Sequence, residues 1–160
     1  MSKETPNSEL RTDNCHLRMV AWELTRSCNL ACSHCRASSE RGPYPGELTT
    51  DECIGIMDEI ASISKPVIIM TGGEPLLRAD IFDLARYGSG KGFRMVMATN
   101  GTLMTEEAVH EMKASEIQRI SVSLDGPNAE THDTFRKVKG AFEGSLRGIE
   151  MAKKGGLEFQ

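Results

Sequence analysis

Short runs of hydrophobic residues alternate along the chain with longer segments in which hydrophobic residues recur every three or four positions. The short runs lie at Met19–Leu24, Val67–Met70, Phe93–Thr99 and Ile120–Asp125, and they predict four β-strands. The β-branched run at Val67–Met70 is typical of a strand buried on both faces of a parallel sheet.

The segments between these runs have the periodicity of helices. Hydrophobic residues recur at helical spacing within residues 53–63, 81–85, 108–112 and 142–149. A capping-box sequence, with Thr49 as N-cap and Glu52 three residues later, opens the first helix. Gly155 and Gly156 end the last one. A strand followed by a helix, four times over, predicts an α/β fold with a parallel sheet and right-handed crossovers.

The fourth predicted strand differs from the others because one of its faces is polar. Ile120, Val122 and Leu124 alternate there with Ser121, Ser123 and Asp125. We expect the apolar set to face helices, so that the polar set points to the interior, where an ordinary barrel packs branched apolar residues. A ligand-filled cavity would explain a polar inner face, and so would an edge strand with one solvated face. The alternation by itself leaves both interpretations open.

The two ends of the chain carry separate predictions. Residues 1–17 are polar and predict a flexible leader, so that residues 18–160 form the single expected domain. Residues 156–160 resemble the start of a fifth strand. A parallel sheet that stopped there would leave an unpaired edge, and we therefore expect the sequence to be a fragment of a longer chain.

Composition excludes several classes of protein. A hydrophobic content of 39% with 26% charged residues suits a globular protein and excludes a mainly disordered one. The net charge of -4 and the lack of a long basic run argue against nucleic acid as a partner. No hydrophobic stretch reaches the roughly 18 residues of a membrane helix, and the leader has no signal core. We therefore expect no membrane association and predict a cytoplasmic location.

Three of the five cysteines lie in one short segment. Cys28, Cys32 and Cys35 have the spacing C-x3-C-x2-C and directly follow the first predicted strand. They therefore occupy a loop at the carboxyl end of a strand, where α/β proteins place their active sites. Three thiolates can hold three irons of a [4Fe-4S] cluster and leave the fourth iron open to another ligand. Cys15 and Cys53 are more simply explained as incidental or buried thiols.

Two other kinds of site fit these cysteines less well. A structural zinc ion takes four ligands, often from two separated pairs, and no second C-x2-C pair exists here. His34 adjoins Cys35 and could not easily bind the same ion. A redox pair formed by Cys32 and Cys35 would leave Cys28 unexplained.

Three further motifs lie at the carboxyl ends of the later predicted strands. They are Gly72-Gly73-Glu74-Pro75, Ala98-Thr99-Asn100-Gly101 and Ser121–Gly126. Taken alone, each motif consists of residues that are common in turns. In order after the cysteine segment, however, they resemble the radical S-adenosylmethionine (SAM) superfamily, over residues from about 19 to 160.

The resemblance implies a fold and two cofactors. The α/β fold would be part of a (βα) barrel of the radical SAM type, truncated after about four βα units, with the later strands missing. The three cysteines would hold a [4Fe-4S] cluster, and S-adenosyl-L-methionine would bind its open iron. Cleavage of SAM would then give a 5′-deoxyadenosyl radical that abstracts hydrogen from a substrate.

The resemblance also implies which residues bind SAM. They are His34, Gly72, Gly73, Glu74, Pro75, Thr99, Asn100, Ser123, Asp125 and Arg136. Glu74 and the neighbouring backbone are expected at the amino group, and Arg136 at the carboxylate, for which a guanidinium is well suited. Ser123 and Asp125 match positions that contact the ribose and methionyl parts. His34 stands where many members carry an aromatic residue near the adenine. No residue is assigned a catalytic role.

The sequence around the cysteines resembles the branch of the superfamily that remodels tetrapyrroles. This similarity lies in Val20–Ala37 and Pro43–Leu48. It implies removal of side-chain carboxyl or acetate groups from a sirohaem-derived haem precursor, with an electron donor such as ferredoxin or flavodoxin. Arg36 and Arg41 could pair with carboxylates of such a substrate. A radical SAM enzyme that modifies a peptide, and a non-catalytic cluster- or zinc-binding module, are the alternatives.

Overall fold

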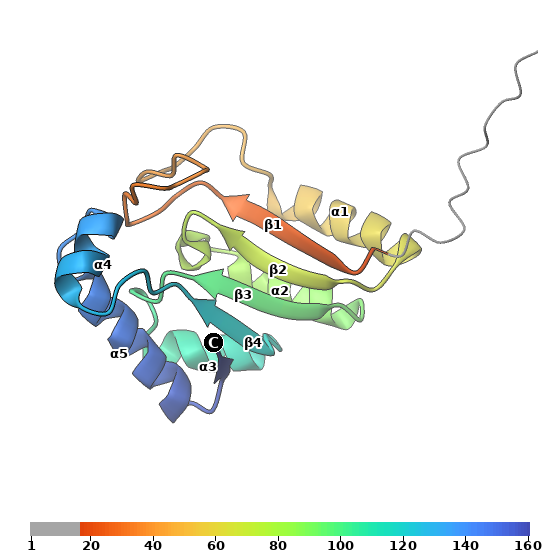
Figure 1. Cartoon of the computed structure of the whole chain (residues 1–160). Helices are drawn as coiled ribbons and strands as arrows, with labels where there is room; N and C mark the ends of the chain where they lie inside the picture. The colour runs from red at the N-terminus through yellow and green to blue at the C-terminus, as the bar shows by residue number, and fades with distance from the viewer. Residues whose placement is uncertain (1–16) are drawn as a thin grey trace, which may run out of the picture.

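The computed structural model describes residues 17–160, and its elements follow one another along a single sheet (Figure 1). They are β1 (Met19–Thr25), α1 (Thr50–Ile63), β2 (Val67–Gly72), the short 3-10 helix η1 (Pro75–Leu77), α2 (Ile81–Gly90), β3 (Arg94–Thr99), α3 (Glu106–Ala114), β4 (Arg119–Val122), α4 (Ala129–Arg136), α5 (Ala141–Lys154) and β5 (Glu158–Phe159). The five strands are parallel, and their order in the sheet is their order in the chain. The predicted α/β fold is therefore confirmed.

The predictions for the two ends of the chain have different outcomes. The expected fifth strand is present as β5, which pairs with β4. The predicted leader falls outside the described residues except for Leu17, and Cys15 falls outside them as well. No helix among residues 17–160 is long and apolar enough to cross a membrane.

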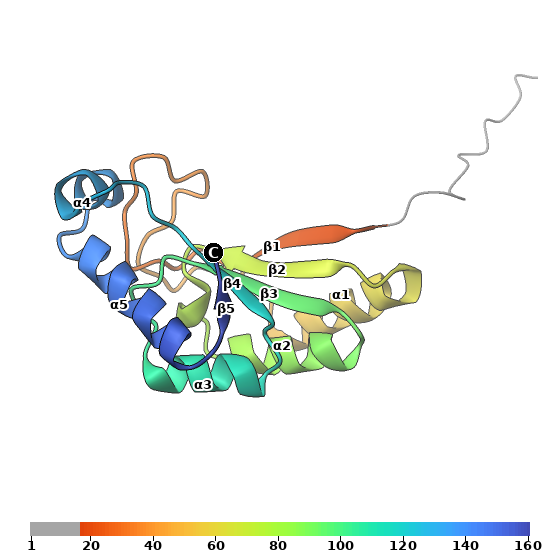
Figure 2. The ribbon, with the colours of Figure 1, turned by 60° about the horizontal axis from the view of Figure 1, so that its bottom comes forward.

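Helices α1, α2 and α3 lie on the same face of the sheet (Figure 2). Side chains of β2 and β3 that point to this face are fully buried, including Ile68, Met70 and Met95. Val67 and Ile69 alternate with them and are only half-buried. The prediction that this strand is buried on both faces was therefore wrong, because no described helix covers the second face.

The strand β4 is shorter than predicted, and this changes the interpretation of its polar side. Ile120 and Val122 are buried on the helix side, as expected, but Leu124 is 44% exposed because the strand has already ended at Val122. Ser123 and Asp125 therefore lie in the connection to α4 rather than in the sheet. Since β4 pairs with strands on both sides, it is not an edge strand.

The start of α1 shows the predicted capping box. The Thr49 hydroxyl accepts a hydrogen bond from the backbone N–H of Glu52 at 3.3 Å. The Glu52 carboxylate in turn accepts one from the backbone N–H of Thr49 at 2.8 Å. Two backbone donors of the first turn are thus satisfied, which fixes the position at which the chain enters the helix.

Replacing Thr49 with alanine removes the side-chain half of this cap. We expect the free energy of unfolding to fall by about 1 kcal/mol, the usual effect of losing an N-cap oxygen. Urea denaturation measures it. Ser62→Ala, on the exposed side of the same helix, is the control and should leave stability nearly unchanged. Equal stabilities for Thr49→Ala and the parent chain would contradict this account of the helix start.

Candidate cofactor site

The cavity that holds the predicted site lies at the carboxyl ends of the strands. Its other wall is the segment of residues 26–49 between β1 and α1, which we call the cysteine loop. The cavity has a volume of about 360 Å³, and all three clustered cysteines line it. Seven of the residues expected to bind SAM also line it: His34, Gly72, Gly73, Thr99, Asn100, Ser123 and Arg136.

Each of the three cysteine sulfurs accepts a hydrogen bond. Cys28 Sγ accepts one from the backbone N–H of Leu30 at 3.4 Å, and Cys35 Sγ accepts one from that of Ser39 at 3.2 Å. Cys32 Sγ lies 3.4 Å from a guanidinium nitrogen of Arg136. Donors of this kind stabilise negative charge on sulfur, as they do around metal-bound thiolates.

The thiols of Cys28 and Cys35 differ in their surroundings. Burial raises the pKa of Cys28, which is 7% exposed, and the nearby charge of Glu74 raises it further. Burial acts in the same direction on Cys35, but hydrogen bonds from Ser39 and the neighbouring backbone outweigh it and lower the pKa of that thiol. The loop therefore presents Cys35 as the more readily ionised of these two cysteines.

This donor set fits an iron–sulfur cluster. The three cysteines are free, and they stand around the cavity rather than converging on the position of one metal ion. Among the residues that the structure describes, the remaining cysteine is Cys53, which is fully buried on α1 away from this cavity. A cluster bound by three thiolates needs just such a set, whereas a structural zinc ion needs four ligands.

The Glu74 side chain lies behind the cavity rather than in it. It is completely buried, and its carboxylate accepts hydrogen bonds from the Thr99 hydroxyl at 2.7 Å and the Asn100 N–H at 2.8 Å. Burial raises its pKa, and these hydrogen bonds oppose that change. Glu74 therefore joins the end of β2 to the end of β3. Pro75 and Asp125 are the other expected SAM contacts that do not line the cavity.

The glycine pair at the end of β2, Gly72 and Gly73, packs closely against the start of the cysteine loop. The Gly73 N–H donates to the Thr25 carbonyl at 2.7 Å, and the Glu74 N–H donates to the Ser27 carbonyl at 2.8 Å. A Cβ on Gly73 would lie 2.3 Å from the Ser27 carbonyl oxygen, and Gly72 has a φ of +140°. The glycines therefore allow a close approach to the backbone that precedes Cys28. They also line the cavity, to which they contribute only backbone atoms.

Helix α4 was not predicted, and it forms one side of the site. It begins after Asn128, whose side chain caps it, and its sequence is mostly polar, so it shows no clear hydrophobic stripe. At its other end, the carbonyls of Phe135 and Arg136 accept hydrogen bonds from Ser33 at 2.9 Å and Ala31 at 3.2 Å. The end of α4 thus holds the middle of the cysteine loop by backbone contacts.

Side chains of α4 extend this contact into the cavity. The Phe135 ring stacks on His34, with 4.4 Å between ring centroids. Arg136 makes an ion pair with Asp125 at 2.5 Å, in addition to its contact with Cys32. His132 is fully buried, and its Nδ1 accepts a hydrogen bond from the Asp125 N–H at 3.2 Å. Sequence reasoning assigned no role to His132 or Phe135, because their partners lie far away in sequence.

Comparison with known protein families matches residues 22–159 to the radical SAM superfamily. The chain belongs to the radical SAM superfamily. A similar curated relative is the AdoMet-dependent heme synthase of Methanosarcina barkeri, 56% identical over 143 residues, which are 89% of this chain and 41% of the relative. The Fe-coproporphyrin III synthase of the same organism is 40% identical over 98% of this chain and 39% of its own length. The chain thus spans about two fifths of the curated relatives it matches.

Solved structures share the fold of this radical SAM chain. One is described as native anSMEcpe with bound AdoMet and Cp18Cys peptide; its TM-score is 0.70, at 22% identity over 91% of this chain and 42% of the other. Another, SuiB of Streptococcus suis bound to its precursor peptide SuiA, has a TM-score of 0.74 at 17% identity over 90% of this chain and 32% of the other. The predicted fold type is confirmed by these similarities.

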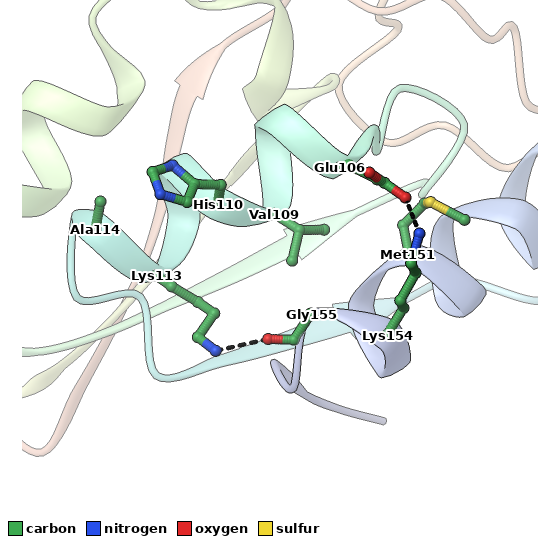
Figure 3. A pocket seen from close by; sticks show the side chains of 8 residues that line it. All are labelled: Glu106, Val109, His110, Lys113, Ala114, Met151, Lys154 and Gly155. Atoms are coloured by element: carbon green, nitrogen blue, oxygen red, sulfur yellow. Dashed lines mark hydrogen bonds and ion pairs between the residues drawn. The ribbon is translucent and has the colours of Figure 1, made fainter.

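A second cavity of the radical SAM chain, of about 540 Å³, lies between α3 and α5 (Figure 3). Its charged side chains are already partnered: Lys113 donates to the Gly155 carbonyl at 2.6 Å, and Lys154 pairs with Glu106. Among residues 17–160, none of the cysteines or motif residues lines it. It is therefore not a candidate for the cofactor site.

Replacing Gly73 with alanine tests the contact between the glycine pair and the cysteine loop. The added Cβ would meet the carbonyl oxygens of both Ser27 and Arg26, which are backbone atoms and cannot simply turn away. We expect a loss of about 1–3 kcal/mol in the free energy of unfolding, as for other overpacked sites. Gly55→Ala is the matched control, because its Cβ would meet nothing within 4 Å.

Urea denaturation of both variants measures the effect. The control should gain up to about 1 kcal/mol, as expected for alanine in place of glycine inside a helix. If Gly73→Ala were as stable as the parent chain, the close packing of the motif on the loop would be refuted.

Proposed function

We propose that the protein is a radical SAM enzyme of haem-precursor maturation. The observation that carries this proposal is the shared cavity, which Cys28, Cys32 and Cys35 line together with the glycine pair and Arg136. A cluster held by three thiolates would have one open iron, and the remaining walls of the cavity are formed by the segments that the family resemblance assigns to SAM. When bound, a reduced [4Fe-4S] cluster would supply the electron that cleaves SAM into methionine and a 5′-deoxyadenosyl radical.

The residues of this chain would bind and orient the two cofactors. The cysteines would hold the cluster, and the backbone of Gly72 and Gly73 would offer polar groups to the SAM amino group. Arg136 is 7% exposed, and its Asp125 partner orients the guanidinium toward Cys32. From that position it would receive the SAM carboxylate, a match of planar, charged groups. His34, held flat by the Phe135 ring, would border the adenine.

The similarity to the haem synthases supports a carboxylated tetrapyrrole as substrate, from which side-chain carboxyl or acetate groups would be removed. Arg36 lines the cavity at its rim and pairs with Glu23 at 3.2 Å, where the two side chains are 91% and 46% exposed. An exposed pair of this kind contributes little to stability. Arg36 is therefore free to exchange Glu23 for a substrate carboxylate. Arg41 is exposed in the same loop but does not line this cavity.

One protein partner completes the proposal. It is an electron donor such as a ferredoxin or flavodoxin, which would supply electrons to the cluster. Neither nucleic acid nor a membrane is part of the proposed activity, and the cytoplasm remains the predicted location.

A radical SAM enzyme of the peptide-modifying or maturation type is the second candidate. The mycofactocin maturase of Mycolicibacterium smegmatis is 37% identical over 138 residues. That identity is lower than the 56% shared with the M. barkeri haem synthase, which is why we favour the tetrapyrrole. Binding of a carboxylated iron porphyrin, measured by its absorbance change against a peptide control, separates the two. A non-catalytic cluster or zinc module would bind neither.

Alanine substitution of each clustered cysteine tests the cluster. After anaerobic reconstitution, the parent chain should contain about four irons and four sulfides. Cys28→Ala, Cys32→Ala and Cys35→Ala should each lose most of this iron and sulfide, because each removes one thiolate ligand. Cys53→Ala is the control and should retain both. With SAM and a strong reductant, only the parent chain and the control should form 5′-deoxyadenosine.

Two results would contradict the proposal. A parent chain that binds one zinc and no sulfide would exclude the radical SAM reaction for this site. Loss of iron from a Cys53→Ala variant that is as stably folded as the parent chain, to the same extent as from the other three, would show that the metal is not held by the proposed ligands.

A further inference from the structure

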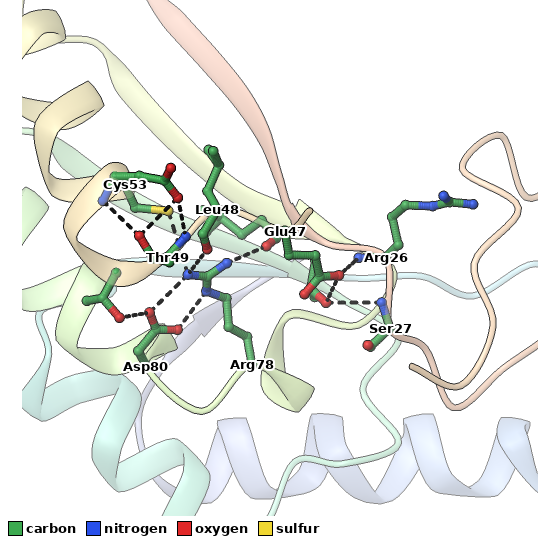
Figure 4. Close-up of polar contacts among 12 residues, drawn as sticks. Arg26, Ser27, Glu47, Leu48, Thr49, Cys53, Arg78 and Asp80 are labelled. Atoms are coloured by element: carbon green, nitrogen blue, oxygen red, sulfur yellow. Dashed lines mark hydrogen bonds and ion pairs between the residues drawn. The ribbon is translucent and has the colours of Figure 1, made fainter. Parts of the chain in front are cut away.

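Arg78, just after η1, is a buried arginine that the proposed function does not use. Only 8% of its side chain is exposed, and it does not line the cofactor cavity. Its guanidinium nevertheless donates hydrogen bonds to two backbone carbonyls from separate segments. One is that of Leu48 at 2.9 Å (Figure 4). The other is that of Leu24 at 2.7 Å.

These two carbonyls lie at the two ends of the cysteine loop. Leu24 is the second-to-last residue of the strand β1, just before the loop, and Leu48 lies two residues before the start of α1. All three clustered cysteines fall between them. One planar side chain therefore joins the chain entering the loop to the chain leaving it, and so closes the loop at its base.

Asp80 fixes the orientation of this guanidinium. Its two carboxylate oxygens accept from Arg78 at 2.6 and 2.9 Å, and one of them also accepts from the Thr50 hydroxyl at 2.6 Å. Burial acts to raise the pKa of Asp80, but the hydrogen bonds from Arg78 and Thr50 outweigh it and lower that pKa. The charge of the Asp80 carboxylate and its two hydrogen bonds together keep the planar guanidinium of Arg78 in one position.

Glu47 adds a second closure at the same place. Its carboxylate accepts a hydrogen bond from the Thr25 hydroxyl at 2.9 Å and one from the Arg26 N–H at 2.6 Å. Thr25 is also the residue whose carbonyl receives the Gly73 N–H, so the base of the loop is tied to the motif that borders the cavity. A displacement at Leu24 would therefore pass directly to the backbone before Cys28.

We propose that Arg78 is a positioning residue that closes the base of the cysteine loop and thereby fixes where the three cysteine sulfurs stand. It acts through backbone carbonyls and touches neither the cavity nor the cysteines that line it. The part of this inference that concerns a bound cluster rests on the proposed function. The part that concerns the loop itself does not.

Lysine cannot replace this arginine. An ammonium group keeps the charge, but it lacks the planar fork that reaches two carbonyls and both oxygens of Asp80 together. Arg78→Lys should therefore release at least one end of the loop while leaving the hydrophobic core unchanged. Closing a flexible loop costs entropy, so a loop released at its base samples many more conformations.

Two variants serve as controls. Arg86→Lys makes the same chemical change at an exposed ion pair with Asp83. Ile120→Val removes a methylene from the buried face of β4, far from the loop in the sheet order, and should cost about 0.5–1.5 kcal/mol. It shows what a general loss of stability does by itself. Asp80→Asn tests the same closure in case Arg78→Lys does not fold.

The first measurement is hydrogen exchange of the chain without cofactors. Amides of residues 25–48 should exchange at least tenfold faster in Arg78→Lys than in the parent chain, while those of β2 and β3 remain unchanged. Asp80→Asn should show the same pattern. Uniformly faster exchange across the sheet, as expected for Ile120→Val, or unchanged exchange in the loop, would overturn the proposal.

The second measurement is the rate at which a chelator removes iron from the reconstituted chain. We expect release at least tenfold faster from Arg78→Lys than from the parent chain, and no change for Arg86→Lys. Equal rates for Arg78→Lys and Ile120→Val would overturn a positioning role. If the parent chain assembled no cluster, the proposed function would fail, and the hydrogen-exchange result would still decide the role of Arg78.

Discussion

The site depends on holding a long irregular segment in one conformation. The cysteine loop carries all three clustered cysteines and contains no helix or strand. The regular backbone hydrogen bonds of such elements therefore do not fix its conformation. Its conformation is set instead by hydrogen bonds inside the loop and by side-chain and backbone contacts that tie it to its surroundings. At its start, the carbonyls of Thr25, which ends β1, and of Ser27 accept hydrogen bonds from the glycine motif. In its middle, the amides of Ala31 and Ser33 donate to the end of α4. Ordering such a segment is costly in entropy, and contacts at several points must offset that cost.

The parallel sheet explains why these contacts gather at one place. The carboxyl ends of parallel strands lie along the same edge, so the residues after β1, β2, β3 and β4 meet there although they are far apart in sequence. Glu74 shows the consequence. Its buried carboxylate after β2 accepts hydrogen bonds from the hydroxyl of the last β3 residue and from the backbone N–H of the residue that follows β3. A buried carboxylate needs such donors. The motifs therefore stabilise one another as well as lining the cavity.

Much of the fold could be predicted from the sequence, because the spacing of hydrophobic residues and the residue types at turns and helix ends are local signals. The alternation of strands and helices, the capping box at Thr49 and the fifth strand were all recognisable. Helix α4 was missed because its sequence is polar and lacks a hydrophobic stripe. Leu124 was misplaced because alternation continues past Val122, where the strand ends. Local pattern cannot show where pairing with a neighbouring strand stops.

The sequence indicated which residues form the candidate site, but it did not indicate where all of their side chains point. The spacing of Cys28, Cys32 and Cys35 placed them together, and the structure puts them around one cavity. The direction in which Glu74 points depends on donors 25 and 26 residues away, and no local signal carries that. Arg78 is similar, since its partners Leu24 and Leu48 are 54 and 30 residues distant. Contacts of this kind are visible only once the chain has folded.

The central claim is that three thiolates hold a [4Fe-4S] cluster whose remaining iron binds SAM. Electron paramagnetic resonance of the reduced, reconstituted chain, with and without SAM labelled with ¹⁵N or ¹⁷O, tests it most directly. The account predicts that SAM changes the spectrum of the reduced cluster and that the labelled amino and carboxylate groups show hyperfine coupling to it. A cluster spectrum that SAM leaves unchanged, with no coupling to either label, would contradict the account.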